Sequence, residues 1–282
     1  MNTGLEDKVV LITGASGGIG GAMLDAFVAE GARVVAHGFR GADGLRTRVA
    51  ARGWGDRVRC EAADHTDPDA VKALFERAVA AFGRVDVCVA NAGRWPVAPR
   101  RLDETPVAEL RTAIADNLLG AMWTARSFLA TLARTGPRPD GHGGALLFTG
   151  STAGRFGEAR HVAYSTAKAG LRGLVRTLKN EIVAIDPWGR VNLVEPGWTA
   201  TERVRATLDR TEFVGHAVQT MPLRQLARPE DIARAAVFLC SPLAARHVSG
   251  EILTVAGGME GRRLWDPAEV DVDLVRERLA ED

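Results

Sequence analysis

The stretch Thr13-Gly14-Ala15-Ser16-Gly17-Gly18-Ile19-Gly20 directly follows the apolar segment Lys8–Ile12, and a helical pattern, Ile19–Glu30, begins within it. Glycine adopts positive φ angles without strain and lets the backbone approach a ligand closely. The N-terminus of a helix carries partial positive charge and unpaired N–H groups, so it favours a diphosphate. A glycine turn between a strand and a helix therefore predicts a parallel α/β fold with a dinucleotide site. A tight turn without a ligand is the alternative for this motif taken alone.

Strand-like and helix-like segments alternate along the rest of the chain. The strand-like segments are mostly unbroken apolar runs, which is typical of strands covered on both faces. They are Lys8–Ile12, Arg33–His37, Arg57–Cys60, Val85–Ala90, Ala145–Thr149, Arg190–Glu195 and Glu251–Val255. The helical patterns include Ile19–Glu30, Pro68–Phe82, Val107–Ala133, Val162–Ile185 and Pro229–Leu239. The alternation predicts one α/β domain over residues 1–259, a Rossmann-type doubly wound parallel sheet of about seven strands with helices on both faces.

The composition of the 282-residue chain is that of an ordinary globular protein, with 36 basic and 35 acidic residues and a formal net charge of +1. Nucleic-acid-binding domains usually carry a basic excess, so this balance argues against a nucleic-acid partner. No apolar run approaches the roughly eighteen residues of a membrane-spanning helix, so no membrane partner is expected. Three separated cysteines and the lack of a basic-then-apolar leader predict a cytoplasmic protein. The six histidines show no paired ligand spacing, so we expect no metal site.

The end of the second predicted strand bears on the choice between NAD(H) and NADP(H). In such folds an acidic residue at this point accepts hydrogen bonds from the adenosine ribose. The segment Ala36-His37-Gly38-Phe39-Arg40 has no carboxylate, and the first one after it is Asp43. The missing acid, with His37 and Arg40 nearby, favours NADP(H), whose 2′-phosphate is an anion. NAD(H) stays possible, because Arg40 could equally be a solvated loop charge.

The chain contains six tryptophans but a single tyrosine, Tyr164. This residue lies four positions before Lys168 in a helical pattern, so the two side chains share one face. A free phenol has a pKa near ~10, and a neighbouring ammonium favours the phenolate and lowers that pKa. The pair predicts a phenol tuned to give a proton to an oxygen atom or take one from it. A surface pair with no chemical role is the alternative for this motif alone.

Together these motifs resemble the short-chain dehydrogenase/reductase family, Tyr-x-x-x-Lys type, over residues 5–259. The glycine turn resembles the family's Thr-Gly-x-x-x-Gly-x-Gly, and Ser151 precedes Tyr164 by thirteen residues, as the family's serine does. Further matches in chain order are Asp64, Ala90-Asn91-Ala92-Gly93, Asn117, Pro196-Gly197, Thr201 and Val255-Ala256-Gly257-Gly258. Ala90 departs from the family's asparagine. Gly17 and Phe39 stand where NADP-preferring relatives carry basic residues, which weakens the argument for NADP(H).

The resemblance implies a role for each catalytic residue. Tyr164 would be the general acid in reduction and the general base in oxidation, and Ser151 would hydrogen-bond the substrate oxygen. Lys168 would hold the nicotinamide ribose and lower the phenol pKa, and Asn117 would hold a water that relays protons. The residues expected to bind the cofactor are Gly14, Ser16, Gly18, Ile19, Gly20, His37, Arg40, Asp64, Asn91, Ala92, Gly93, Tyr164, Lys168, Pro196, Gly197, Thr199 and Thr201.

Segments that line the mouth of the site in this family supply candidate substrate contacts. These are Arg94, Trp95, Arg155, Phe156, Arg160, His161 and Trp198. The basic residues among them would suit a carboxylate or phosphate on the substrate, although surface arginines are commonly only solvated. The segment 197–221 is too long for a routine connection, so we expect a lid, with an ordinary surface excursion as the alternative.

Two further features depart from the family pattern. Glu195, just before Pro196-Gly197, could touch the floor of the site and perturb Lys168, but we favour a hydrogen-bonded structural glutamate. Residues 260–282 form a charged extension, in which a short helix from Pro267 is expected to pack on the protein surface or on a neighbouring subunit.

We therefore expect an oxidoreductase that transfers a hydride between NADP(H), or NAD(H), and a small-molecule ketone or secondary alcohol. Among substrates, 3-oxoacyl thioesters, sugars or polyols and secondary-metabolite ketones all remain open. The alternative from another class is a dinucleotide-binding sensor without turnover; such relatives typically lose the tyrosine or lysine that this chain keeps. The helices Val107–Ala133 and Val162–Ile185 resemble those that pair subunits, which implies a homodimer or homotetramer.

Overall fold

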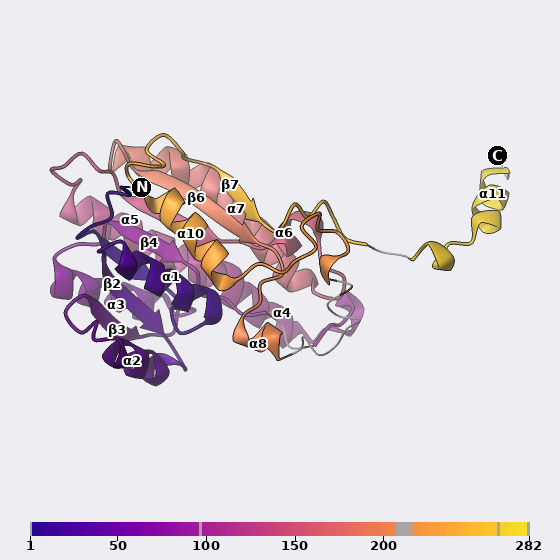
Figure 1. Cartoon of the computed structure of the whole chain (residues 1–282), viewed down its shortest axis with the longest axis horizontal. Helices are drawn as coiled ribbons and strands as arrows, with labels where there is room; N and C mark the ends of the chain where they lie inside the picture. The colour runs from indigo at the N-terminus through magenta and orange to yellow at the C-terminus, as the bar shows by residue number, and fades with distance from the viewer. Residues whose placement is uncertain (1, 96–97, 207–214, 216, 264–265, 281–282) are drawn as a thin grey trace.

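The computed structural model describes residues 2–95, 98–206, 215, 217–263 and 266–280, and its centre is one seven-stranded sheet (Figure 1). The strands are β1 Val9–Ile12, β2 Arg33–Gly38, β3 Val58–Ala62, β4 Val87–Ala90, β5 Ala145–Thr149, β6 Arg190–Pro196 and β7 Ile252–Val255. Their order across the sheet is β3-β2-β1-β4-β5-β6-β7, and every neighbouring pair is parallel. The predicted doubly wound parallel sheet is confirmed.

Helices cover both faces of this sheet. The principal ones are α1 Gly18–Ala29, α2 Ala42–Ala51, α3 Pro68–Phe82, α4 Val107–Ile114, α5 Gly120–Thr135, α6 Thr152–Phe156, α7 Val162–Glu181, α8 Glu202–Arg205, α10 Pro229–Cys240 and α11 Val272–Ala280. One apolar layer joins the sheet to α1, α2 and α10, and the other joins it to α3, α5 and α7. Val10 and Ile12 of β1 point into the first layer and Leu11 into the second. Burial on both faces explains the unbroken apolar runs of the strands.

The order of the strands reverses direction between β1 and β4, which are neighbours in the sheet. In doubly wound folds the loops after two such strands diverge and leave a crevice at their carboxyl ends, where ligands bind. The glycine turn follows β1, and Asn91 follows β4. The fold therefore brings two separately predicted motifs to one edge of the sheet.

The predicted helix Val107–Ala133 is interrupted in the structure. Between α4 and α5 the backbone forms a π-helical turn, Ala115–Leu119. Such turns insert a residue into a helix and occur often at functional sites. The apolar periodicity of this region continues through the turn, so it does not reveal the interruption.

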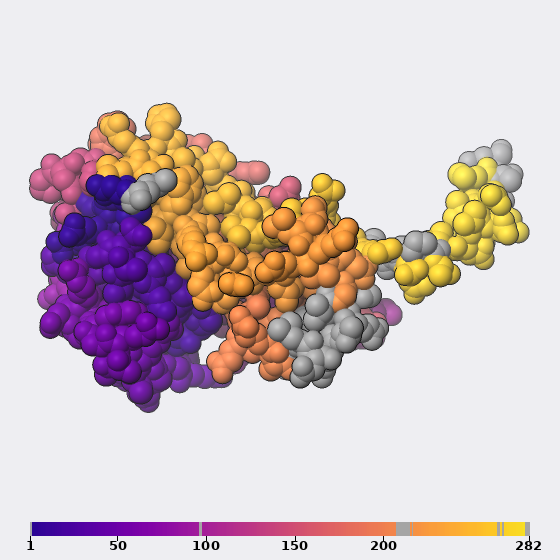
Figure 2. Space-filling view, viewed as in Figure 1, coloured from indigo at the N-terminus to yellow at the C-terminus, as the bar shows by residue number. Residues whose placement is uncertain are grey.

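The C-terminal extension divides into two parts. Its first residues, Gly261 and Arg262, are half-buried against the domain, whereas α11 stands apart from it (Figures 1 and 2). The α-helix begins at Val272 after a 3₁₀ turn at Pro267–Glu269, and apolar side chains such as Leu279 are exposed. The prediction that this helix packs on the protein's own surface is wrong; packing on a neighbouring subunit stays a prediction.

The predicted lid over residues 197–221 falls partly outside the described residues, at 207–214 and 216. The described part contains the short helix α8. No helix within the described residues is long and apolar enough to cross a membrane. Within the same residues, no group of three or more His, Cys, Asp or Glu side chains is placed to hold a metal ion.

Candidate active site

Glycines at positions 14, 18 and 20 let the turn after β1 pack closely against its neighbours. Gly14 has a φ of +71°, and a Cβ atom there would lie 2.9 Å from Cα of Ala92. A Cβ on Gly18 would lie 2.8 Å from the methyl group of Thr201, and one on Gly20 would collide with the Gly14 carbonyl oxygen. The turn is thus packed against the loops after β4 and β6. This close packing places the N-terminus of α1 at the mouth of the crevice.

The loop after β4 holds this turn through Thr13 and Asn91. The Thr13 hydroxyl oxygen accepts hydrogen bonds from the backbone N–H groups of Asn91 and Ala92, both at 3.0 Å. The Asn91 side-chain amide donates to the Thr13 carbonyl oxygen at 3.0 Å. The side chain of Asn91 therefore stabilises the crevice, in addition to lining it.

The side chain of His37 also holds the glycine turn after β1. Its Nδ1 accepts a hydrogen bond from the Gly14 N–H at 3.2 Å, so the ring proton is on Nε2, which donates to the Ala63 carbonyl oxygen at 2.9 Å. The side chain is 1% exposed, and burial lowers its pKa. A neutral imidazole with both nitrogens occupied cannot pair with a phosphate. The prediction that His37 contacts the cofactor is therefore wrong, and its role is to fix Gly14.

The other residues predicted for the adenosine side lie outside the crevice lining. Ser16 and Arg40 are exposed. Asp64 is half-buried, and its Oδ1 accepts from the backbone N–H and the hydroxyl of Thr66 at 2.9 and 2.7 Å, which lowers the pKa of the carboxyl. Arg40, whose charge also helps to lower the pKa of Asp64, remains the candidate contact for the 2′-phosphate.

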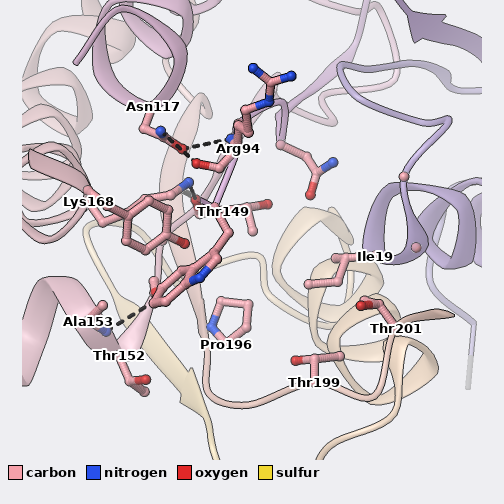
Figure 3. Close-up of a pocket in the computed structure, with 18 of the residues that line it drawn as sticks. Ile19, Arg94, Asn117, Thr149, Thr152, Ala153, Lys168, Pro196, Thr199 and Thr201 are labelled. Atoms are coloured by element: carbon pink, nitrogen blue, oxygen red, sulfur yellow. Dashed lines mark hydrogen bonds between the residues drawn. The ribbon is translucent and has the colours of Figure 1, made fainter. Parts of the chain in front are cut away.

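A pocket of about 510 Å³ at the carboxyl edge of the sheet, called here the catalytic pocket, gathers most of the predicted residues (Figure 3). The four predicted catalytic residues, Asn117, Ser151, Tyr164 and Lys168, all line it. The predicted cofactor residues that line it are Gly14, Gly18, Ile19, Gly20, Asn91, Ala92, Gly93, Tyr164, Lys168, Pro196, Gly197, Thr199 and Thr201. The loops after β1, β4, β5 and β6 thus converge on one cavity with residues of α1, α7 and the π-helical turn.

Tyr164 and Lys168 are placed by α7, and Ser151 by the start of α6. Ser151 is the N-cap of α6, where its Oγ accepts from the Ala153 N–H at 3.2 Å, and its hydroxyl also hydrogen-bonds the Tyr164 phenol. Lys168 is 6% exposed, and its Nζ donates to the Thr149 carbonyl oxygen at 2.9 Å (Figure 3). The three side chains therefore meet where the i, i+4 spacing and the end of β5 predicted.

Burial dominates the ionisation of Tyr164 and Lys168. Burial raises the pKa of Tyr164 to about 12, and the hydrogen bond from Ser151 opposes the rise. Burial lowers the pKa of Lys168 to about 8. The Lys168 Nζ lies 5.8 Å from the centre of the phenol ring. Desolvation penalises both charged forms, so the net direction of the phenol shift is upward, and the lowering of the phenol pKa by Lys168 stays a prediction.

Asn117 lies in the π-helical turn, and its side chain holds the loop after β4. Its Oδ1 accepts from the Arg94 N–H, and its Nδ2 donates to the carbonyl oxygens of Arg94 and Ala113, all at 3.0 Å (Figure 3). A Cβ on Gly93 would lie 2.7 Å from Asn117 Oδ1 and 3.3 Å from Lys168 Nζ. The π-helical turn thus brings Asn117 against both the loop and the lysine.

His65 completes the π-helical turn from outside the helix. The Gly120 N–H donates to the Ala115 carbonyl oxygen, one residue further back than in an α-helix, which releases the Asp116 carbonyl oxygen. The His65 Nε2 lies 3.0 Å from that oxygen. A Cβ on Gly120 would collide with the His65 ring, so glycine is required there. The sequence carries no signal for this role of His65, because no local pattern links it to residue 116.

A second cavity of about 1230 Å³ adjoins the catalytic pocket, and the two share Trp95, Glu158, Trp198 and Arg262. Trp95 forms the common wall: its ring centre lies 4.7 Å from that of Tyr164, edge-on, and 4.5 Å from that of His161. Among the predicted substrate contacts, Arg94, Trp95 and Trp198 line the catalytic pocket; Trp95, Phe156, Arg160, His161 and Trp198 line the second cavity.

Arg155 is the exception among these predicted contacts. It lines neither cavity, since it stacks on Phe156 at 4.9 Å and donates to Thr254 Oγ1 at 3.2 Å. Two residues absent from the prediction take part instead: the carboxylate of Glu158 accepts from Arg262 Nε at 2.8 Å. They are 104 positions apart, and no sequence pattern connects them.

Glu195 is a structural residue, as favoured from the sequence. Its buried carboxylate accepts hydrogen bonds from the Arg172 guanidinium at 2.8 Å and from the Thr254 hydroxyl at 3.1 Å. These partners tie β6 to α7 and β7, beside the pocket. Among the described residues, Arg172 and Thr254 are the hydrogen-bond partners of the Glu195 carboxylate, and Lys168 is not one of them.

Comparisons with known proteins agree with this geometry. A family model described as enoyl-(acyl carrier protein) reductase matches residues 14–260. The chain is 37% identical to cis-4-hydroxycyclohexanecarboxylate dehydrogenase of Sinomonas cyclohexanicum, over 92% of this chain and 98% of that protein. It is 36% identical to L-rhamnose 1-dehydrogenase (NAD(P)(+)) of Azotobacter vinelandii, over 90% and 97%. A short-chain type dehydrogenase/reductase from Mycobacterium marinum superposes with a TM-score of 0.79 at 28% identity, over 90% and 96%.

Proposed function

Because the chain belongs to the short-chain dehydrogenase/reductase family, we propose that it interconverts a ketone and a secondary alcohol with NADP(H) as the preferred cofactor. The observation that carries the proposal is the position of Tyr164, which is buried beside Ser151 and Lys168 in the catalytic pocket. Burying a lysine without a carboxylate partner is energetically costly. A tyrosine that served only in packing would not require such a lysine beside it. Perturbed titratable groups in a cleft are a mark of functional sites.

The pocket fits a nicotinamide dinucleotide. The glycine turn presents the N-terminus of α1, which suits a diphosphate. An ammonium has three donors, and Lys168 donates one hydrogen bond to Thr149, so it could also hold ribose hydroxyls. Thr149 Oγ1 is buried in the same pocket, with no partner among the described residues. When bound there, the dinucleotide would supply or accept the hydride.

The residues of the chain then supply the proton. In reduction, Ser151 orients the carbonyl oxygen and Tyr164 Oη donates its proton to it; in oxidation, Tyr164 takes the proton from the alcohol. Burial raises the pKa of Tyr164, so the phenol is protonated at neutral pH, as proton donation in reduction requires. Asn117 positions the backbone of Arg94 at the edge of the pocket. The water relay through Asn117 is part of the proposal.

His37 is occupied by Gly14 and Ala63, so Arg40 is the remaining basic residue on which the proposed preference for NADP(H) depends. No carboxylate ends β2, and Arg40 is exposed just beyond it. Hydrogen bonds to a charged group contribute about 1.5–3 kcal/mol, and solvent exposure reduces this, so Arg40→Ala should lower the NADPH-over-NADH ratio of kcat/KM about tenfold. Arg52→Ala, at the far end of α2, is the matched control. An unchanged ratio in Arg40→Ala would remove the basis for the preference.

Other features of the protein are proposed on the same basis. We propose residues 1–259 as one catalytic domain, 197–221 as a lid over the site, a cytoplasmic location, and a homodimer or homotetramer paired through α4, α5 and α7. The two relatives named above act, by their names, on a hydroxycyclohexanecarboxylate and on L-rhamnose. Cyclic ketones and alcohols, neutral and anionic, are therefore the first substrates to test.

The deciding experiment measures loss of NADPH absorbance over a panel of cyclic ketones, with Tyr164→Phe measured in parallel. We expect at least one ketone to be reduced by the wild-type protein and not by the variant. Binding of NADPH without turnover across the panel would instead favour a dinucleotide sensor.

A further inference from the structure

The cavity beside the catalytic pocket, called here the arginine chamber, has a distinctive charge. Four arginines line it, Arg100, Arg160, Arg262 and Arg263, whereas Glu158 is the one carboxylate among the described lining residues. That carboxylate is already paired with Arg262. Given the proposed function, on which this inference rests, we propose that the chamber binds a carboxylate group of the substrate, with Arg262 as its main contact.

Arg262 is held in position before any ligand arrives. Its side chain is 17% exposed and lies over the Phe156 ring at 5.7 Å. The Nε donates to Glu158 at 2.8 Å, and one terminal nitrogen, Nη2, donates to the Thr152 hydroxyl at 3.2 Å. Thr152 lies at the edge of the catalytic pocket in Figure 3. The guanidinium is therefore fixed at the junction of the two cavities, and little side-chain entropy is lost when it binds a ligand.

The terminal nitrogens of Arg262 have weak partners. Nη1 is directed at the Met259 sulfur, a poor acceptor, and lies 3.4 Å from the Gly261 carbonyl oxygen. Nη2 bonds a neutral hydroxyl. A carboxylate accepting from these two nitrogens would replace neutral contacts by charge-assisted hydrogen bonds, which are about twice as strong. Glu158 would keep its bond to Nε, so the ligand adds to the ion pair without breaking it.

Another wall of the chamber carries backbone strain. Arg160 has a φ of +66°, which L-residues rarely adopt, and its carbonyl oxygen accepts from the Arg100 N–H at 2.9 Å. Strained residues persist where the surroundings hold them and cluster at ligand-binding sites. Here the hydrogen bond ties together two of the four arginines, and both are exposed. Arg100 also pairs with the Glu109 carboxylate at 3.5 Å, so the positive charge of this wall comes mainly from Arg160.

The aromatic wall sets the shape of the substrate. Trp95 stands between Tyr164 and the chamber, with Trp198 at 6.0 Å and His161 at 4.5 Å between ring centres. A ketone whose carbonyl reaches Tyr164 and Ser151 must place the rest of its structure along these rings. The substrate class is therefore a cyclic or aryl ketone, or the matching alcohol, with a carboxylate on the side remote from the reacting carbon.

The test compares 4-oxocyclohexanecarboxylate with its neutral analogue, 4-oxocyclohexanecarboxamide. We expect the wild-type protein to prefer the carboxylate by about tenfold or more in kcat/KM. Arg262→Ala should reduce this preference to about one, mainly through KM, while Arg278→Ala in the exposed helix α11 leaves it unchanged. Glu158→Gln removes a competing negative charge, so it should lower KM for the carboxylate severalfold. If Glu158→Gln instead damaged the structure of the chamber, KM for the carboxylate would rise.

A binding measurement that needs no turnover accompanies the kinetics. Cyclohexanecarboxylate is titrated into the NADP⁺-loaded protein and followed by tryptophan fluorescence, and Arg262→Ala should weaken its binding at least tenfold. The inference is overturned if the wild-type protein shows no carboxylate preference, if cyclohexanecarboxylate does not bind, or if Arg262→Ala affects both ketones equally. Reduction of neutral ketones would in each case leave the proposed function intact. The proposed function itself would fail if no ketone were turned over in a Tyr164-dependent reaction.

Discussion

The catalytic pocket and the arginine chamber share Trp95, Glu158, Trp198 and Arg262, but they are built differently. The side chains at the reacting end of the pocket, such as Tyr164 and Lys168, are buried and held by neighbours close in the chain or on adjacent strands. The chamber is lined by four arginines, of which Arg262 is half-buried and the others are exposed, and by aromatic residues from the loops after β4 and β6, from α6 and from the start of α7.

Under the proposed function, this difference corresponds to two tasks of one site. Proton transfer needs groups that are desolvated and fixed to within a fraction of an ångström, which burial and backbone hydrogen bonds provide. Selection among substrates needs complementary charge and shape, which side chains near the surface supply. Changes in the pocket should therefore act on kcat for every substrate, and changes in the chamber on KM for particular ones.

The largest expected effect is that of Tyr164→Phe, which removes one oxygen atom from the pocket. We expect kcat to fall by about 10²- to 10⁴-fold for every ketone, because the proton donor is lost. NADPH affinity and Tm should stay near the wild-type values, measured by fluorescence titration and thermal unfolding. A loss confined to some substrates would break the proposed separation of tasks.

Lys168 should give reduction a pH dependence. Its pKa of about 8 means that it is an ammonium below about pH 8 and neutral above. If the ammonium assists proton release from Tyr164, kcat/KM for reduction falls about tenfold per unit above that pH. Lys168→Arg retains its charge, so the fall should disappear from its pH–rate profile, although its absolute rate is lower. The same fall in the arginine variant would assign it to another group.

Isotope-labelled tyrosine tests the ionisation of the pocket directly, because Tyr164 is the only tyrosine. With a pKa of about 12 in the free protein, the labelled NMR resonance should not titrate between about pH 6 and pH 10, since a free phenol has a pKa near ~10. A titration midpoint at or below about 10 would mean that Lys168 outweighs burial.

Trp95→Ala should have an intermediate effect, because Trp95 is the wall shared by the two cavities. Removing its ring contacts with Tyr164, His161 and Trp198 should lower kcat/KM for cyclic ketones about tenfold, since aromatic pairs contribute about 0.5–1.5 kcal/mol each. Trp188→Ala, on the exposed surface, serves as the control. NADPH affinity should not change, and a weakened affinity would place Trp95 with the cofactor instead.

The smallest expected effect is that of His65→Ala, which leaves the Asp116 carbonyl oxygen without its partner. One lost hydrogen bond costs about 0.5–1.5 kcal/mol, so kcat should fall a few-fold while KM for the ketone stays constant. His65→Gln retains an N–H donor and should restore part of the rate; His247→Ala, an exposed histidine, should change nothing. Equal losses in the alanine and glutamine variants would contradict a role for this hydrogen bond.

Several features of the site were predictable from short stretches of sequence. The glycines at 14, 18 and 20 are required by contacts within the turn and with adjacent loops, and the i, i+4 spacing of Tyr164 and Lys168 is a property of any helix. His37 was misassigned because its place near the end of β2 does not say what its side chain meets. In the structure it meets Gly14 and Ala63.

The sequence by itself determined the parallel α/β fold, the glycine turn and the shared helical face of Tyr164 and Lys168, because these depend on periodicity, on backbone freedom and on spacing within single elements. Tertiary structure decided the direction of the Tyr164 and Lys168 pKa shifts, the pairing of His65 with the π-helical turn, and the place of Arg262 beside Glu158. Each of these depends on desolvation or on contact between residues far apart in the chain, and both exist only once the chain has packed.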